Sequence, residues 1–204
     1  MRKIFLVRHG ESQWNTLKKI QGQQDIPLTE GGLKQANLIG NRLMNEKIDR
    51  IYSSDLIRAF NTAEIIGGKL NINVIPMEEF REINFGIWEG MSNEKMLLKY
   101  HDEYLMWKRV PEKLKIEGAE SLEELQSRAM NGINKIMRNG KDDNILIVSH
   151  SATLKTIILG LLDIDLTYFK NLTLDNVSLT IIEIRDYNRV LKVINDTCHI
   201  KENK

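Results

Sequence analysis

This 204-residue chain has a single cysteine, three prolines and no long hydrophobic run. Because Cys198 is the single cysteine of the sequence, no intrachain disulfide can form, and a reducing, cytoplasmic setting is expected. No CxxC motif and no Cys/His cluster has the spacing of a zinc site, so neither a metal nor another cofactor is predicted. No apolar stretch reaches the roughly 20 residues that span a bilayer, which argues against a membrane protein.

An excess of charge of one sign is also missing. The 29 Lys and Arg residues nearly balance the 28 Asp and Glu residues, which leaves a formal net charge of +1. A broad basic field that would bind nucleic acid or an anionic membrane is therefore excluded, and any anion site must be local. The length suits one domain, residues 1–204, with one hydrophobic core.

Short apolar runs alternate with amphipathic segments along the whole chain. This pattern predicts an α/β fold, a three-layer α/β/α sandwich with a mostly parallel central sheet. The expected strands cover residues 3–8, 50–53, 73–76, 144–149, 177–185 and 189–194, the last two as a hairpin. The expected helices cover residues 29–45, 56–66, 92–110, 121–139 and 152–162.

Local signals set several of the expected helix ends. Thr29 is a good N-cap, and Ser121 with Glu124 forms a capping-box pattern. The pair Gly67-Gly68 is expected to close the helix that begins near residue 56, because glycine commonly ends helices.

Two histidines follow apolar strands in the same way. The apolar run Ile4 to Val7 stops at Arg8-His9-Gly10, and the run from 145 to 148 leads to His150. In open α/β sheets, ligands bind beyond the carboxyl ends of the strands, and a glycine there lets the backbone approach an anion. A lone strand-end histidine is more often an ordinary loop residue. Two in matching positions, one preceded by an arginine, favour a phosphate site.

At this point the sequence resembles the histidine phosphatase superfamily, which includes cofactor-dependent phosphoglycerate mutases, fructose-2,6-bisphosphatases and broad-specificity bacterial phosphatases. The resemblance spans nearly the whole chain. It is carried by LVRHGESQWN at 6–15, IQGQQDIPLTEGGLKQA at 20–36, IYSSDLIRAFNTAE at 51–64, FREINFGIWEG at 80–90, EGAES at 117–121 and ILIVSHSATLK at 145–155. A bare RHG tripeptide would mean little, but these blocks in this order are specific.

The resemblance implies that His9 is a nucleophile that forms a phosphohistidine. Its attacking nitrogen must be unprotonated, so a backbone carbonyl is expected to hold the other ring nitrogen. Arg8 and Arg58 would clamp the phosphoryl oxygens, and His150 would be a third donor. The implied substrate-binding residues are Asn15, Gln21, Gly22 and Ser151. Such a cluster can stabilise phosphoryl transfer without a metal.

Two of these residues have a simpler interpretation when taken alone. Arg58 lies on an expected helix, where an arginine is usually solvated or ion-paired, and only the surrounding motif favours a site role. Asn15 could simply cap or turn the chain after the first strand.

Glu82 is the implied general acid and base, because the phosphatase branch of the family has its acid at that position of FREINFGIWEG. Glu79 and Glu89 are interpreted as surface charges, and Glu11 is a less favoured candidate. The family's mutases carry Arg-His-Tyr-Gly and a longer insertion after the acid. This chain has Ile-Asn-Phe-Gly at residues 83–86 instead, which favours hydrolysis over mutase chemistry.

The chain departs from the family beside His150. Ser151 stands where glycine is common, and Lys155 stands where arginine is common; Lys155 is interpreted as a surface residue. The region 88–118 is expected to form a small helical cap, whose aromatic and methionine side chains are interpreted mainly as packing. Aromatic walls with few added positive charges favour monophosphates of small alcohols over bisphosphates.

The expected function is a phosphomonoesterase that hydrolyses small phosphorylated metabolites through a phosphohistidine, of the broad-specificity or α-ribazole phosphatase type. The alternatives are a metal-independent phosphoserine phosphatase, a phosphoglycerate mutase, a phosphotyrosine protein phosphatase and a non-catalytic phosphate-binding protein. The expected partner is a small phosphorylated substrate, with no nucleic acid and no membrane. A homodimer that pairs through the outer strand at 189–194 stays open.

Overall fold

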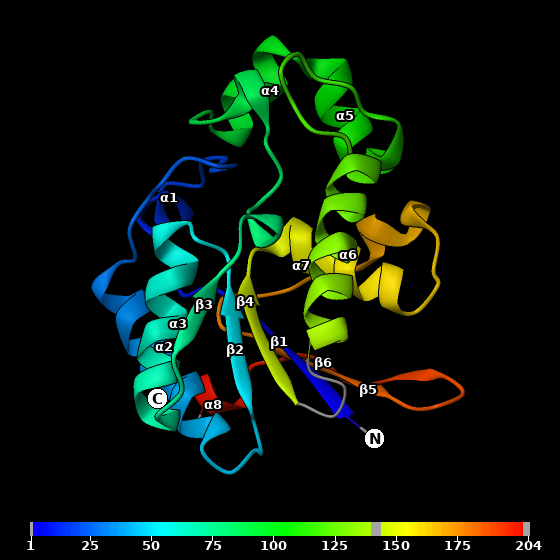
Figure 1. The fold of residues 1–204 in the computed structure, drawn as a ribbon. Coiled ribbons are helices and arrows are strands. Elements are labelled where there is room, and N and C mark those ends of the chain that lie inside the picture. The colour runs from blue at the N-terminus through cyan, green and yellow to red at the C-terminus, as the bar shows by residue number, and fades with distance from the viewer. Residues whose placement is uncertain (1, 140–143, 202–204) are drawn as a thin grey trace.

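The computed structural model describes residues 2–139 and 144–201, and its centre is one six-stranded sheet (Figure 1). The strand order is β3-β2-β4-β1-β5-β6. The strands are β1 (Arg2–Arg8), β2 (Arg50–Ser53), β3 (Val74–Pro76), β4 (Ile145–Ser149), β5 (Leu179–Ile184) and β6 (Arg189–Asp196). The first four run parallel to one another, whereas β5 is antiparallel to β1 and β6 is antiparallel to β5. The predicted mostly parallel sheet is confirmed.

The register of the two central strands places their ends side by side. Arg8 is paired with Ser149, and the amide of His9 donates to the carbonyl oxygen of Ser149 at 3.0 Å. His9 and His150, separated by most of the chain, therefore leave the same edge of the sheet next to each other.

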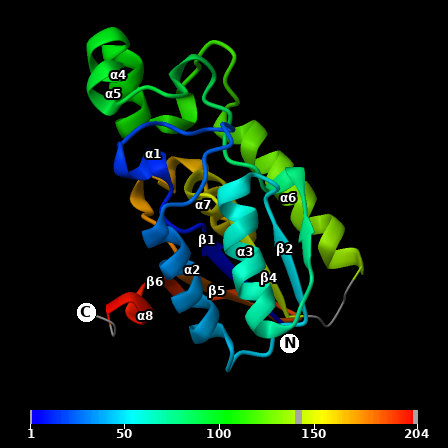
Figure 2. The same cartoon turned by 90° about the vertical axis from the view of Figure 1, so that its left-hand side faces the viewer.

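Helices cover both faces of the sheet (Figures 1 and 2). On one face lie α2 (Glu30–Leu43), α3 (Ile57–Leu70) and the short α8 (Cys198–Lys201); on the other lie α6 (Leu122–Asn139) and α7 (Ser151–Leu161). Side chains of a strand alternate between its faces, so β1 contributes to both cores. Phe5 and Val7 pack under α2 and α3, whereas Ile4 and Leu6 pack under α6 and α7. The three-layer sandwich is confirmed.

The predicted caps are present at two helices. The side chain of Thr29 accepts from the amide of Gly32 at the start of α2. Ser121 and Glu124 form the capping box of α6: the Ser121 amide donates to Glu124 Oε2 at 2.8 Å, and the Glu124 amide donates to Ser121 Oγ at 3.2 Å. These local signals were sufficient to place both helix starts.

The prediction that Gly67-Gly68 closes α3 is wrong. The helix continues to Leu70 and ends at Asn71, whose φ of 56° is left-handed. Gly67 is needed for a close approach instead, because a Cβ there would lie 2.6 Å from the carbonyl oxygen of Ile72. This packing requirement between α3 and the chain that returns to β3 cannot be distinguished from a stop signal in the sequence.

The cap is built from two short helices, α4 (Asn93–Lys99) and α5 (His101–Arg109), followed by a 3₁₀ turn at Pro111–Lys113. The single helix expected over 92–110 is broken at Tyr100, whose φ of −136° and ψ of 51° are not helical. The helical cap itself lies above one end of the sheet (Figure 1).

Short elements complete the chain: α1 (Gln13–Thr16) and 3₁₀ turns at Glu78–Phe80, Gly86–Trp88 and Leu166–Asn171. Within residues 2–139 and 144–201, no helix has the length and apolar character needed to cross a membrane.

Candidate active site

His9 is buried at the carboxyl end of β1, with 3% of its surface exposed. Its Nδ1 lies 2.7 Å from the carbonyl oxygen of Gly10, and because a carbonyl can only accept, Nδ1 carries the proton. Nε2 is therefore left with a free lone pair. Burial, together with the charges of Arg58 and Arg8, lowers the pKa of His9 well below its ordinary 6.5. The ring is neutral at physiological pH, as a nucleophile requires.

His150 is fully buried beside His9, with ring centroids 5.1 Å apart in an edge-on arrangement. Its Nε2 lies 2.8 Å from the hydroxyl of Ser54, which follows strand β2. Since a serine hydroxyl can donate to Nε2, the remaining nitrogen, Nδ1, is available as the protonated donor. Burial is the main reason that the pKa of His150 lies well below its ordinary value, and the charge of Arg58 lowers it further.

Two arginines flank these rings. Arg8 is fixed by donation from Nη1 to the carbonyl oxygen of Leu174 at 2.7 Å. Arg58, on the first turn of α3, donates to the carbonyl oxygens of Gln24 and Gly22, both at 2.7 Å. Burial lowers the pKa of Arg58 to about 10, so the guanidinium remains charged at neutral pH. Arg58 is 1% exposed, which rules out its interpretation as a solvated surface residue.

Three donors around His9 are buried without a hydrogen-bond partner among the described residues. They are Nε of Arg8, Nε of Arg58 and Nδ1 of His150. An unpaired buried donor costs roughly 1–3 kcal/mol. Three such donors beside two guanidinium charges fit an anion with several acceptor oxygens, which is the chemistry of a phosphoryl group.

The carboxylate of Glu82 lies at the start of α7. Its Oε1 accepts from the amide of Thr153 at 3.2 Å and from the hydroxyl of Thr153 at 3.1 Å, and its Oε2 accepts from the amide of Ala152 at 3.3 Å. A carboxylate is favoured at a helix N-terminus, where the backbone amides point outward. This helix also begins directly after His150, so the same element positions Glu82 and the phosphate-facing ring.

Three of the predicted substrate-binding residues, Asn15, Gln21 and Gly22, lie in the segment that follows β1, whereas Ser151 is the first residue of α7. The side-chain oxygen of Asn15 caps the short helix α1 through Ser12, so the capping interpretation holds and only its Nδ2 is left to donate to a ligand. The side-chain oxygen of Gln21 accepts from the hydroxyl of Ser12 at 2.8 Å. Gly22 contributes the carbonyl that fixes Arg58, with a left-handed φ of 52°.

The competing carboxylates have other partners than the α7 amides that bind Glu82. Glu79 forms an ion pair with Lys135, and Glu11 accepts from the hydroxyl of Thr29 at 2.8 Å. Glu89 is more than the surface charge it was interpreted to be. It accepts from the amides of Gln23 and Phe85 at 2.9 and 3.2 Å and so ties the loop that holds Arg58 to the loop after Glu82.

Arg128 on α6 is a structural residue that the sequence analysis missed. It forms a two-point ion pair with Glu120, at 2.8 Å for each contact. Its Nη1 also donates to the carbonyl oxygens of Glu79 and Arg81, which precede Glu82 in the chain. Arginine on the polar side of an amphipathic helix is normally solvated, so no signal in the sequence marks it.

Ser54 was also missed, and Lys155 was interpreted as a surface residue. Ser54 follows a strand in the same way as the two histidines, so the strand-end rule could have found it. Lys155 is half-buried, which contradicts its interpretation as a surface residue. Its Nζ lies over the ring of Phe169, 4.6 Å from the centroid, because α7 packs against the 3₁₀ turn at Leu166–Asn171.

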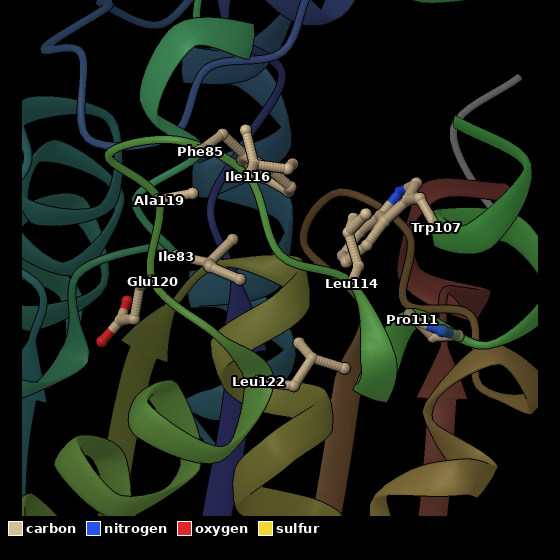
Figure 3. Close-up of a pocket in the computed structure, with 9 residues that line it drawn as sticks. All are labelled: Ile83, Phe85, Trp107, Pro111, Leu114, Ile116, Ala119, Glu120 and Leu122. Carbon is tan, nitrogen blue, oxygen red and sulfur yellow. The ribbon is translucent and has the colours of Figure 1, made fainter. Parts of the chain in front are cut away.

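An apolar pocket separates the loop after Glu82 from the cap (Figure 3). Ile83 and Phe85 line it from the loop, and Trp107, Pro111 and Leu114 of the cap line it from the opposite side. Beside this pocket, the ring of Trp107 packs edge-on against the ring of Phe85, with centroids 5.2 Å apart, which supports the interpretation of the cap aromatics as packing residues.

Among the residues that the structure describes, no group of three or more His, Cys, Asp or Glu side chains is arranged to hold a metal ion. What the described site offers is a neutral imidazole, two guanidinium groups, a second buried imidazole and a carboxyl group. This set can bind a phosphoryl group, attack it and exchange a proton with its leaving group.

The family model described as "Histidine phosphatase superfamily (branch 1)" matches residues 4–197 of this sequence. The chain belongs to the histidine phosphatase superfamily. As a histidine phosphatase it is a phosphoric monoester hydrolase, and the family predicted from the six sequence blocks is confirmed.

Individual relatives agree with this assignment. Phosphoserine phosphatase 1 from Hydrogenobacter thermophilus is 35% identical over 202 residues, which cover 99% of this chain and 96% of that protein. YhfR from Bacillus stearothermophilus has a TM-score of 0.93 and 31% identity, covering 98% of this chain and all of the other. A mutant phosphoserine phosphatase from Entamoeba histolytica in complex with phosphoserine has a TM-score of 0.88 and 34% identity, with the same coverage.

Proposed function

We propose that this histidine phosphatase hydrolyses small phosphomonoesters through a phosphohistidine on His9, with Glu82 as acid and base. The observation that carries the proposal is the contact between His9 Nδ1 and the carbonyl oxygen of Gly10, which leaves Nε2 unprotonated in a cluster of cationic and unpaired donors. A neutral nucleophile beside an anion-binding cluster is the combination that phosphoryl transfer needs.

In the first step, the lone pair of His9 Nε2 attacks phosphorus and the bond from phosphorus to the ester oxygen breaks. Arg8, Arg58 and His150 stabilise the charge on the remaining phosphoryl oxygens. The protonated carboxyl of Glu82 gives its proton to the departing oxygen, so the product leaves as a neutral alcohol.

In the second step, water attacks the phosphohistidine. The Glu82 carboxylate, left ionised by the first step, takes one proton from this water, and the bond between phosphorus and His9 Nε2 breaks. Inorganic phosphate leaves, His9 recovers its lone pair and Glu82 is protonated again for the next substrate.

Hydrolysis is favoured over mutase chemistry by the segment after the acid. Ile83 and Phe85 bury their side chains against the cap, and Asn84 is the one polar side chain among them. A mutase must bind a second phosphorylated group there, and this segment adds no positive charge for it. Two relatives named phosphoserine phosphatases support O-phosphoserine as the first candidate substrate, ahead of the broad-specificity and α-ribazole types.

The test is phosphate release from O-phosphoserine, 3-phosphoglycerate, α-ribazole phosphate and p-nitrophenyl phosphate, with EDTA present. The wild type should release phosphate, and His9→Ala should lower the rate by roughly 10⁴-fold or more, as nucleophile removal does in other covalent enzymes. Transfer within 3-phosphoglycerate without release would indicate a mutase. Release that His9→Ala leaves unchanged would contradict the proposal.

We further infer a cytoplasmic setting, supported by the presence of a single cysteine, with which no intrachain disulfide can form. A homodimer would use the outer edge of β6, which ends the strand order of the sheet. Light scattering at micromolar concentration tests whether the protein is a homodimer, and a mass equal to that of the monomer would exclude the dimer.

A further inference from the structure

The reactive tautomer of His9 depends on the backbone of Gly10, whose carbonyl oxygen lies 2.7 Å from Nδ1 of the ring. Glycine turns more freely than any other residue, so Gly10 does not fix this carbonyl by its own preferences. A larger residue does not fit here, because a Cβ at Gly10 would lie 2.5 Å from the carbonyl oxygen of Gly32. The orientation of the Gly10 carbonyl must therefore be set by contacts from the surrounding chain.

The peptide unit between His9 and Gly10 is held at its amide edge by Thr62. The amide of Gly10 donates to Thr62 Oγ1 at 3.1 Å. Thr62 is fully buried, and its hydroxyl donates to the carbonyl oxygen of Arg58, one turn earlier in α3, at 2.7 Å. Since a hydroxyl has one proton and two lone pairs, this donation leaves Oγ1 as an acceptor for Gly10. The same turn of α3 thus carries an arginine of the site and supports the backbone beside the nucleophile.

The opposite edge of this peptide unit is held by the segment before β5. The carbonyl oxygen of His9 accepts from Asn176 Nδ2 at 2.9 Å, and the amide of Val177 donates to it at a longer 3.4 Å. Val177 has a left-handed φ of 50°, which a β-branched residue rarely adopts and which persists only where surrounding contacts enforce it. Because the His9 carbonyl and the Gly10 amide belong to one planar unit, holding both prevents the unit from rotating.

We propose that Thr62 and Asn176 are positioning residues for the nucleophile: together they hold the peptide unit between His9 and Gly10, which keeps the Gly10 carbonyl on Nδ1. This inference rests on the proposed function, in which Nε2 of His9 attacks phosphorus. When the peptide unit turns, Nδ1 loses its acceptor, and the ring exchanges through water to the other neutral tautomer. That tautomer carries its proton on Nε2, so it has no lone pair on the attacking nitrogen and cannot form the phosphohistidine.

The first test is kinetic. Single-turnover rates with p-nitrophenyl phosphate isolate the attack by His9, because nitrophenolate departs without a proton. Thr62→Val keeps the shape of the side chain and should lower the maximal rate by about 2- to 10-fold, the loss expected for one neutral hydrogen bond. The substrate concentration for half-maximal rate should stay unchanged, since both tautomers leave the cationic groups in place. Thr62→Ser should recover most of the rate, and Asn176→Ala, at a half-buried position, should lower it as Thr62→Val does.

Nuclear magnetic resonance separates this role from a purely structural one. In protein with histidine labelled by nitrogen-15, two-bond correlations between ring protons and ring nitrogens show which nitrogen carries the proton. His9→Ala identifies the His9 signals among the four histidines of the chain. The wild-type ring should be protonated on Nδ1, and in Thr62→Val and Asn176→Ala it should shift towards protonation on Nε2 in proportion to the loss of rate. A lower rate with the proton still on Nδ1 would mean a structural role only and would overturn the proposal, as would unchanged rates in both variants.

Thr156→Val is the matched control for the tautomer. Thr156 is also fully buried, and its hydroxyl donates to the carbonyl oxygen of Thr153, in the preceding turn of α7, at 2.8 Å. This variant loses the same kind of hydrogen bond and should leave His9 protonated on Nδ1. The same tautomer shift in Thr156→Val would show a general response to lost buried hydroxyls and would contradict the assignment of Thr62.

A double-variant cycle tests whether the two side chains act on one peptide unit. The losses of rate in Thr62→Val and Asn176→Ala should not simply multiply when the changes are combined, because both residues hold the same group. Losses that multiply would mean independent effects and would count against the proposal. If His9→Ala retains activity, the phosphohistidine mechanism fails, whereas the tautomer seen by resonance still decides the roles of Thr62 and Asn176.

Discussion

At the scale of single residues, the chemistry depends on two histidines kept neutral among arginines. Removing His9 and His150 from water disfavours their charged forms, and the Arg58 charge adds to the effect on both rings. The same burial leaves the arginines charged, since even the lowered pKa of Arg58 is about 10. One environment therefore produces an unprotonated nucleophile and a permanent cationic clamp.

The first prediction concerns stability and pH. In the unfolded chain His9 takes up a proton near pH 6.5, whereas in the folded protein its pKa is well below that value. The contribution of this shift to the free energy of unfolding is therefore fully present above pH 6.5 and is lost as the pH decreases. Between pH 7.5 and 5.5, wild type should lose roughly 1 kcal/mol more unfolding free energy than His9→Gln. Urea titrations at the two pH values measure these losses. Equal losses in the two proteins would show that folding does not lower the pKa of His9.

The second prediction concerns the proton donor. Glu82→Gln keeps the size of the side chain but cannot donate a proton, so kcat for an alkyl phosphate such as O-phosphoserine should fall by about 10²–10⁴-fold. p-Nitrophenyl phosphate should lose far less in its first step, because nitrophenolate departs without a proton. Single-turnover kinetics with both substrates make the comparison, and Glu79→Gln, at a carboxylate that pairs with Lys135, serves as a control outside the proton path. Equal losses for the two substrates would falsify the assignment of Glu82 as the acid.

At the scale of elements, the ends of strands and the first turns of helices position the site. Register between β1 and β4 aligns the two histidines, and α7 begins where Glu82 needs amide donors. Helix α3 brings Arg58 to the loop carbonyls of Gly22 and Gln24. The course of α3 therefore determines where Arg58 lies. That course depends on Gly67, which was predicted to end the helix.

The third prediction uses the two glycines of α3 as a matched pair. A Cβ at Gly67 would meet the Ile72 carbonyl oxygen at 2.6 Å and Val74 Cγ2 at 3.1 Å, whereas at Gly68 no atom lies within 4 Å. Gly67→Ala should therefore destabilise the protein by about 1–3 kcal/mol. Gly68→Ala should stabilise it by about 0.5–1 kcal/mol, because alanine favours the helix. Chemical denaturation distinguishes them, and a change of the same sign in both variants would contradict this account of the packing.

At the scale of the whole molecule, the site joins segments from both halves of the sheet. Its groups come from the end of β1, the start of α3, the loop before the cap and the junction of β4 with α7. An anion that binds these groups holds together elements far apart in the sequence. Ligand binding should consequently be visible as stability of the entire fold.

The fourth prediction follows from this coupling. Inorganic phosphate at about 100 times its Kd should stabilise the folded state by about 2.7 kcal/mol. For a chain of this size that corresponds to an increase in Tm of roughly 5–10 °C. Scanning calorimetry at matched ionic strength checks it, with chloride as control salt and with EDTA, which should change nothing. The same increase in Arg8→Met would place phosphate outside the proposed site.

The sequence by itself determined the strands, most of the helices, the family and the histidine pair. These follow from signals that act within a few residues: apolar runs that stop at Arg8 and at Ser149, capping residues such as Thr29, and motif blocks read in order. Such signals reflect local backbone and burial preferences, which the neighbouring residues largely decide.

Only the tertiary structure decided how distant residues are used. Glu82 rests on amides of Ala152 and Thr153, Glu89 ties together two loops, and Lys155 ends over Phe169 instead of in solvent. Each of these contacts forms when segments far apart in the chain pack against each other. A side chain's burial and partners are set by that packing, so a lysine on a helix and a glycine within one carry no local sign of their roles.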